Sequence, residues 1–427
     1  MTIRSVSFLL LVLPLLSAPW CQASSGAQSR DFPWSGGDEI STVVYPGAGK
    51  QLLLMLPSER GVSPRQAPLA EGLARRGVET WVVDLHGTLF LPPGTGSLRD
   101  VPADMMAELV QYAVATGKQV YLMATGRSAA LALKAARQWQ MDHPRQAGLG
   151  GMILFHPDLY RLTPQGGTAP EFLPVTDATN LPTYLFQPMN ASARWHLNEL
   201  VERLQKGGSD VLVQRLQDVG NGFHLRPHYS DLEEETSARL PSLIKQAMRL
   251  LEPYARPREA IDLSLKSEAG AGGSTLGAGA ELRRFSGKSD APPLRLTDLR
   301  GIEYDLAKYR GQVVLVNFWA TWCPPCVEEI PSLQRLAERL AGKAFRVLTV
   351  DVGEDAATVR AFMDQFKVDF PVLMDPDGTA VRQWRVYAFP TSFVIDRSGV
   401  VRYSLFGALE WDAPEVVARI EELLREQ

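Results

Sequence analysis

Two cysteines three residues apart, in the segment Trp322-Cys323-Pro324-Pro325-Cys326, are the side chains best suited to chemistry in this sequence. An apolar run precedes them and a helical pattern of apolar residues follows, so Cys323 is predicted at the N-terminus of a helix. There, unpaired N–H groups and the helix dipole favour a thiolate over a thiol. Cys326 lies one turn deeper, a spacing at which the two sulfurs can alternate between a dithiol and a disulfide. The pair therefore predicts disulfide exchange, with Cys323 attacking a substrate disulfide and Cys326 resolving the mixed disulfide.

Two other uses of a cysteine pair remain open, a structural disulfide and a metal site. A zinc site needs about four ligands. All six histidines lie between His86 and His228, so the part of the chain that carries the cysteines has none. A covalent haem motif would need histidine where Val327 follows Cys326. The sequence therefore predicts no metal and no cofactor other than the redox-active disulfide itself.

The surrounding pattern predicts how the pair is positioned. Apolar strands alternate with helices. An antiparallel hairpin follows, with a tight turn at residues 396–399. The expected elements are a strand at 313–319, a helix at 324–340, a strand at 345–350, a helix at 356–366, an extended segment at 370–374, strands at 392–395 and 400–405, and a helix at 413–424.

This region, roughly residues 287–427, resembles the thioredoxin superfamily and, within it, the exported TlpA/ResA-like thiol:disulfide oxidoreductases. The resemblance is carried by residues 316–326, by Glu329 and Pro331, and by the segment Phe389-Pro390-Thr391-Ser392-Phe393. It implies a thioredoxin-like fold over 291–427. It also implies a cis peptide before Pro390 that faces Cys323 and pairs with a substrate chain, with Trp322 and Thr391 as substrate contacts.

The resemblance also implies a proton-transfer group and partners. Glu329 is the implied acid/base group, and Asn317 stands where ordinary thioredoxin has a buried aspartate, which makes Glu329 the better candidate for that role. The implied partners are protein disulfides and a membrane-bound electron donor. Cytochrome c maturation and envelope redox homeostasis are the usual roles in the family.

Strands and helices also alternate in the N-terminal half and predict a doubly wound α/β domain over residues 40–252. Between a strand at 119–123 and a helix at 128–139, the segment Thr125-Gly126-Arg127-Ser128-Ala129-Ala130 is similar to the G-x-S-x-G nucleophile elbow, with alanine in place of the last glycine. His224 follows the last strand, in the expected chain order. The domain therefore resembles α/β-hydrolases.

Two interpretations of this domain remain open. In the first, Ser128 is a nucleophile activated by His224, and the protein is a serine esterase-type hydrolase with an accessory redox domain. The usual position of the acid offers only Asn190, so Asp158 is the candidate substitute. In the second, Ser128 caps its helix and the domain is a degenerate hydrolase fold that docks a partner or substrate.

The rest of the chain indicates export and two domains. A net charge of −4 gives no electrostatic footprint for nucleic acid, and the sequence has no basic run with interleaved aromatic residues. Residues 1–23 predict a signal peptide, because their apolar run is too short to cross a bilayer. We therefore expect a protein of the periplasm or cell envelope, anchored in the membrane if the segment stays uncleaved. Residues 24–38 are expected to be loose, and residues 264–290 form a Gly/Ala/Ser-rich tether that should leave the two domains independent.

Overall fold

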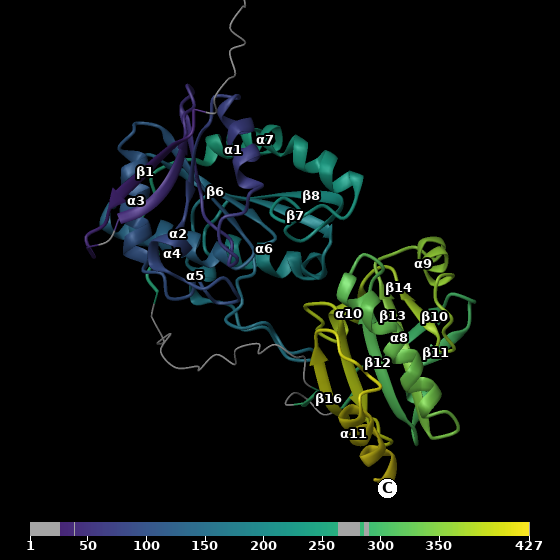
Figure 1. The fold of residues 1–427 in the computed structure, drawn as a ribbon. Helices are drawn as coiled ribbons and strands as arrows, with labels where there is room; N and C mark the ends of the chain where they lie inside the picture. The colour runs from purple at the N-terminus through teal and green to yellow at the C-terminus, as the bar shows by residue number, and fades with distance from the viewer. Residues whose placement is uncertain (1–25, 38, 264–281, 286–289, 427) are drawn as a thin grey trace, which may run out of the picture.

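The computed structural model describes residues 26–37, 39–263, 282–285 and 290–426, which form two α/β domains (Figure 1). The expected signal peptide lies outside the described residues. In the N-terminal domain one eight-stranded sheet has the order β1-β2-β4-β3-β5-β6-β7-β8. Its strands are β1 (Gln28–Pro33), β2 (Glu39–Tyr45), β3 (Gln51–Met55), β4 (Glu79–Val83), β5 (Gln119–Thr125), β6 (Leu149–Phe155), β7 (Thr183–Asn190) and β8 (Val211–Gly220).

Helices cover both faces of this sheet, as the strand–helix alternation predicts. Apolar side chains of α3, α4 and α6 are buried in one core, and those of α1 and α7 are buried in a second core on the opposite face. The helical segments are α1 (Gln66–Ala74), α2 (Leu85–Leu89), α3 (Ala103–Val114), α4 (Ser128–Asp142), α5 (Pro174–Asp177), η1 (Ser192–His196), α6 (Leu197–Lys206), α7 (Asp231–Leu251) and η2 (Glu252–Tyr254).

The prediction of a loose segment at 24–38 is wrong for residues 28–33. These residues form β1, which pairs antiparallel with β2, and β2 pairs antiparallel with β4. Phe32 is buried and stacks on Trp81 at a centroid distance of 4.5 Å. A polar sequence can thus be held as an edge strand by pairing with β2 and by one buried aromatic ring.

The C-terminal domain holds a second eight-stranded sheet, in the order β11-β10-β14-β13-β12-β15-β16-β9. Helices α8, α9 and α11 share one core with this sheet, and α10 packs on the other face. The elements are β9 (Arg283–Arg284), β10 (Arg295–Asp298), β11 (Glu303–Asp305), η3 (Leu306–Tyr309), β12 (Val313–Trp319), α8 (Pro324–Arg339), β13 (Phe345–Val352), α9 (Ala356–Met363), β14 (Val372–Asp375), α10 (Thr379–Gln383), β15 (Thr391–Ile395), β16 (Val401–Phe406) and α11 (Pro414–Arg425).

Strand β12 is central and positions the cysteine pair. All seven of its residues are buried, and it pairs parallel to β13 and antiparallel to β15. A strand enclosed on both faces requires the continuous apolar run that the sequence shows. The chain leaves β12 at Trp319 and enters α8 at Pro324, so Cys323 lies at the edge of the sheet where β15 begins.

The segment predicted as a tether contains structure. Strand β9 falls inside residues 264–290 and pairs with β16, and Leu282 is buried in the core of the C-terminal domain. Residues 264–281 and 286–289 lie outside the described residues. The two domains also contact each other through hydrogen bonds, in contrast to the predicted independence.

Candidate functional site

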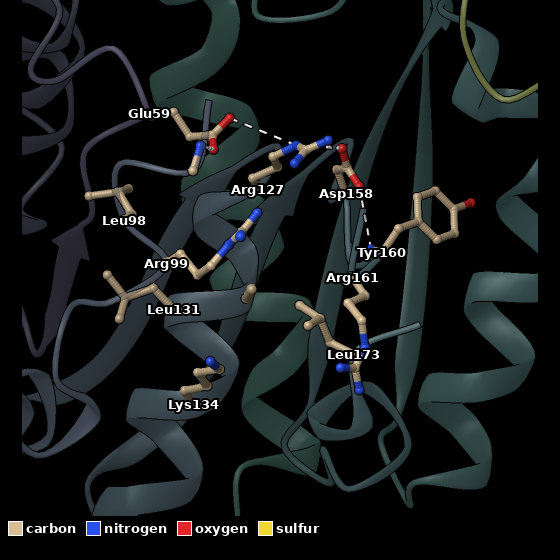
Figure 2. Close-up of a pocket in the computed structure, with 12 residues that line it drawn as sticks. Glu59, Leu98, Arg99, Arg127, Leu131, Lys134, Asp158, Tyr160, Arg161 and Leu173 are labelled. Atoms are coloured by element: carbon tan, nitrogen blue, oxygen red, sulfur yellow. Dashed lines mark hydrogen bonds and ion pairs between the residues drawn. The ribbon is translucent and has the colours of Figure 1, made fainter. Parts of the chain in front are cut away.

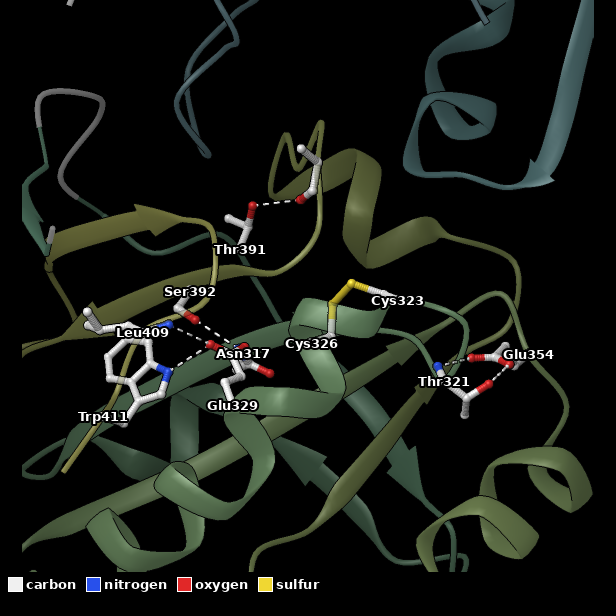
Figure 3. The surroundings of a disulfide bond; sticks show 11 residues. Asn317, Thr321, Cys323, Cys326, Glu329, Glu354, Thr391, Ser392, Leu409 and Trp411 are labelled. Atoms are coloured by element: carbon white, nitrogen blue, oxygen red, sulfur yellow. Dashed lines mark hydrogen bonds between the residues drawn. A yellow bond between two sulfur atoms is a disulfide. The ribbon is translucent and has the colours of Figure 1, made fainter. Parts of the chain in front are cut away.

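The cysteine pair forms a disulfide at the start of α8 (Figure 3). Cys323 is the N-cap residue of the helix and Cys326 lies in its first turn, as the sequence predicts. Both cysteine residues are buried, Cys323 being 5% exposed and Cys326 1% exposed. Their positions match the order expected from the sequence, with Cys323 at the helix N-terminus and Cys326 deeper in the first turn.

The peptide bond between Phe389 and Pro390 is cis, which confirms what the resemblance implies. Because β15 begins at Thr391 and lies beside β12, Pro390 is placed at the same sheet edge as the turn that carries Cys323. The Phe389 ring also approaches the Trp322 ring, with 5.8 Å between centroids. The segment that ends at Pro390 thus borders the disulfide.

The two expected substrate contacts differ in the structure. The side chain of Thr391 is buried and its hydroxyl donates a hydrogen bond to the carbonyl of Ala388 at 2.7 Å, so this side chain is not presented to a substrate. Trp322 is partly exposed, and its indole N–H has no hydrogen-bond partner among the described residues. Of the two side chains, only Trp322 is placed to touch a substrate.

Glu329 lies one turn beyond Cys326 on α8 and is 2% exposed (Figure 3). Its carboxylate accepts hydrogen bonds from the Asn317 side chain at 2.7 Å, the Trp411 indole at 3.1 Å and the Leu409 backbone N–H at 3.3 Å. Burial raises the pKa of Glu329 to about 7, although the three donors lower it. A carboxyl group with this pKa can both accept and donate a proton near neutral pH, which suits acid/base work.

A second pair of carboxyl groups lies near the active-site turn and was not found from the sequence. Glu354 accepts hydrogen bonds from the backbone N–H and the hydroxyl of Thr321, at 2.7 and 2.6 Å. Asp351 is completely buried, and burial and the neighbouring Glu354 raise its pKa far above the usual range. Thr321 precedes Cys323 by two residues, so Glu354 holds the segment that leads to the cysteines. The only sequence indication was an aspartate within a buried strand.

The candidate hydrolase residues do not assemble into a triad. Ser128 is buried at the start of α4, where its hydroxyl donates to the carbonyl of Thr125 at 2.9 Å and accepts from the Thr125 N–H at 3.0 Å. His224 forms its hydrogen bond with the Thr125 hydroxyl, at 3.0 Å, and Asp158 forms an ion pair with Arg127 at 3.0 Å. These three described side chains therefore each have another partner.

The conformation of the turn between β5 and α4 explains why Ser128 is not placed as a nucleophile. A nucleophile elbow places its serine on a sharp, strained turn between strand and helix. Here the residue with positive φ at this turn is Gly126, at 60°, two residues before Ser128. A Cβ atom at Gly126 would lie 3.5 Å from Cε1 of His156, so the apex of the turn faces a histidine but carries no hydroxyl.

We expect a fluorophosphonate probe to leave Ser128 unlabelled in the folded protein. The hydroxyl is fully buried and both of its hydrogen-bond functions are occupied by Thr125. Burial also lowers the pKa of His224 to about 3, and its hydrogen bond goes to Thr125 rather than to the serine. Intact-mass spectrometry after incubation measures the labelling, and Ser128→Ala is the control. Stoichiometric adduct on Ser128 would restore the hydrolase interpretation.

A charged pocket lies at the same edge of the N-terminal sheet (Figure 2). Arg127 lies between Asp158, at 3.0 Å, and Glu59, at 3.9 Å. Open α/β sheets bind ligands at the carboxyl ends of their strands. The pocket is lined by four basic and two acidic side chains together with apolar groups, namely Glu59, Leu98, Arg99, Arg127, Leu131, Lys134, Asp158, Tyr160, Arg161 and Leu173 among others.

Comparisons with known proteins assign the C-terminal part of the chain. The sequence model of the AhpC/TSA family matches residues 288–404. The thiol-disulfide oxidoreductase ResA of Geobacillus kaustophilus is 37% identical over 121 residues, which cover 28% of this chain and 70% of the relative. The chain belongs to the ResA-like thiol-disulfide oxidoreductases.

A second ResA and one solved structure were also found to be similar to this part of the chain. ResA of Bacillus subtilis is 35% identical over 123 residues, covering 27% of this chain and 69% of the relative. A solved structure described as a putative thiol:disulfide interchange protein DsbE from Chlorobium tepidum is 32% identical, with a TM-score of 0.31, and the match covers 32% of this chain and 97% of that one. Residues 288–404, which the AhpC/TSA model matches, lie within the domain that carries Cys323 and Cys326.

Among the described residues, no group of three or more histidine, cysteine, aspartate or glutamate side chains is arranged to hold a metal ion. In the same part of the chain, no helix combines the length and the apolar character needed to span a bilayer.

Proposed function

We propose that this ResA-like protein is an exported reductase of protein disulfides, and that its N-terminal domain recruits or positions the substrate. The observation that carries the proposal is the Cys323–Cys326 disulfide, which lies at a helix start beside the cis-proline segment, with the buried Glu329 one turn further along α8. Residues 1–23 support export, to the periplasm or cell envelope.

In the proposed reaction the reduced pair transfers two electrons to the substrate. The Cys323 thiolate attacks one sulfur of the substrate disulfide, forming a mixed disulfide and releasing the other substrate sulfur as a thiolate. Cys326 then loses its proton and attacks the Cys323 sulfur, which releases the second substrate sulfur as a thiolate and leaves Cys323 and Cys326 oxidised. Glu329 is the group proposed to take the proton from Cys326. A dithiol donor, which the resemblance suggests is bound to the membrane, must return two electrons and two protons. Cytochrome c maturation and envelope redox homeostasis are the cellular roles proposed for this step.

For the N-terminal domain we propose docking rather than hydrolysis. The positions of Ser128, His224 and Asp158 do not favour an esterase, because each is engaged elsewhere. The turn after β5 and the helices on both faces of the sheet support a hydrolase-like architecture in which a glycine, Gly126, stands at the apex of the turn instead of a nucleophile. The pocket around Arg127 offers basic groups to an acidic part of a partner.

The reduction potential of the Cys323–Cys326 pair tests whether the protein is a reductase. We expect a value between about −300 and about −220 mV, in the range of thioredoxin and the glutaredoxins. Equilibration with glutathione or dithiothreitol buffers, read out by thiol alkylation and mass spectrometry, measures it. A value near about −120 mV would indicate an oxidase instead.

A further inference from the structure

The segment η1 (Ser192–His196) of the N-terminal domain is bonded to the backbone just before the cis-proline. The Nε2–H of His196 donates to the carbonyl of Val386 at 2.8 Å, and the hydroxyl of Ser192 donates to the carbonyl of Tyr387 at 2.9 Å. The His196 ring also stacks on the Tyr387 ring, with 4.0 Å between centroids. Both donor residues are 9% exposed, so these bonds are shielded from water. Hydrogen bonds in such surroundings restrict the backbone more than exposed ones.

A second loop of the N-terminal domain holds the two preceding carbonyls. The N–H of Gly167 donates to the carbonyl of Trp384 at 2.9 Å and is shared with that of Arg385 at 3.3 Å. Arg385 has φ of 49°, a conformation that residues other than glycine rarely adopt and that persists where the surroundings fix it. Four consecutive carbonyls, of residues 384–387, thus accept hydrogen bonds from the other domain.

Two glycines of the redox domain let η1 approach this closely. The guanidinium of Arg194 donates to the carbonyl of Gly353 at 3.0 Å, and the ring of Trp195 lies against Gly378. A Cβ atom at Gly353 would overlap the Arg194 guanidinium, and one at Gly378 would overlap the Trp195 ring. The surfaces of η1 and of the redox domain are therefore complementary in shape where Arg194 and Trp195 meet the two glycines.

The clamped backbone leads directly to the redox centre. Tyr387 is three residues before Pro390, and the intervening Phe389 packs against Trp322, next to Cys323. A displacement of residues 384–387 would therefore be passed to the cis-proline segment through a short stretch of covalently linked and packed residues. We define residues 384–390 as the cis-proline loop.

We propose that the N-terminal domain is a built-in clamp of the cis-proline loop, and that Ser192 and His196 are positioning residues for the binding of polypeptide disulfides. This inference rests on the proposed reductase function, in which the cis-proline loop pairs with the substrate chain. A small disulfide that makes no backbone contact with the loop should depend on the clamp far less. The N-terminal domain then affects substrate binding through its contacts with the cis-proline loop, in addition to any recruitment of the substrate.

The double variant Ser192→Ala/His196→Ala in the full chain tests the clamp. Loss of two hydrogen bonds and a ring contact should raise the KM for a disulfide-linked polypeptide, insulin, by about tenfold. The rate with bis(2-hydroxyethyl) disulfide should change by less than about twofold, because the sulfur chemistry is untouched. Amide hydrogen exchange of residues 385–391 should become at least about tenfold faster, with that of α8 unchanged.

The matched control is Ser237→Ala/His228→Ala, which removes another hydrogen-bonded serine–histidine pair of the N-terminal domain, 2.8 Å apart, from α7 and the loop before it. Circular dichroism checks that each variant folds, and His196→Gln, which keeps a donor, should retain a KM close to that of the parent. If the double variant matches the control in both KM and hydrogen exchange, the clamp is refuted. If the parent protein itself reduces neither disulfide, the reductase proposal fails, while hydrogen exchange still decides the clamp.

Discussion

Cys323→Ser is expected to lower disulfide reduction by at least about a thousandfold, because a serine hydroxyl is a far poorer nucleophile than a thiolate. Cys323 is the N-cap residue of α8 and is 5% exposed, whereas the remaining Cys326 lies in the first turn of the helix and is 1% exposed. The turbidity caused by insulin reduction, with dithiothreitol as the donor, measures the rate above the uncatalysed background. Circular dichroism of the variant should match that of the parent.

Cys326→Ser is the variant matched to Cys323→Ser, and it should trap the reaction at an intermediate instead of preventing its first step. Cys323 can still attack a substrate disulfide, but no thiol is left one turn along the helix to displace the product. Mixed disulfides with the substrate should therefore accumulate and appear as adducts in non-reducing gels and in intact-mass spectra. If Cys323→Ser also formed these adducts, or kept its activity, the assignment of Cys323 as the attacking residue would be wrong.

Glu329→Gln is expected to slow reduction near pH 7 by about a hundredfold, at the lower end of the range for general acid–base catalysis. Burial raises the pKa of Glu329 to about 7, so its carboxyl group changes charge where the reaction is measured. The glutamine keeps the size of the side chain but cannot exchange a proton. The pH profile of the rate between pH 5 and 9 should therefore lose the inflection near pH 7.

Protein stability offers a second measurement of the same group. A carboxyl whose pKa is about 7 when folded and near 4.5 when unfolded favours folding in its neutral form. Its stabilising contribution is complete below about pH 4.5 and falls as the pH rises through about 7, by about 3 kcal/mol in total. Urea unfolding of Glu329→Gln should lack this decrease. Glu328→Gln, on an exposed position of the same helix, is the control and should behave like the parent. If the free energy of unfolding depended on pH in the same way for Glu329→Gln and the parent, the proposed proton-transfer role of Glu329 would be wrong.

The sequence by itself determined the redox centre, because the relevant information is local. The spacing of Cys323 and Cys326 after an apolar run predicted both the helix start and the chemistry, and the structure places them there. The segment around Pro390 predicted a cis peptide through its resemblance to a family, and this is confirmed. Most helices and buried strands were also predicted, since their periodicity is set by neighbouring residues.

Tertiary structure decided what depends on distant partners. The pKa of Glu329 follows from burial and from donors such as Trp411, which is 82 positions away. The sequence left open whether the hydroxyl of Ser128 is a nucleophile or a helix cap, and in the structure this hydroxyl bonds to Thr125 beside the turn at Gly126. The bonds of Ser192 and His196 to the cis-proline loop join residues at least 190 positions apart. Composition and periodicity describe only neighbours along the chain, so they predicted independent domains, whereas the two domains contact each other through hydrogen bonds between distant residues.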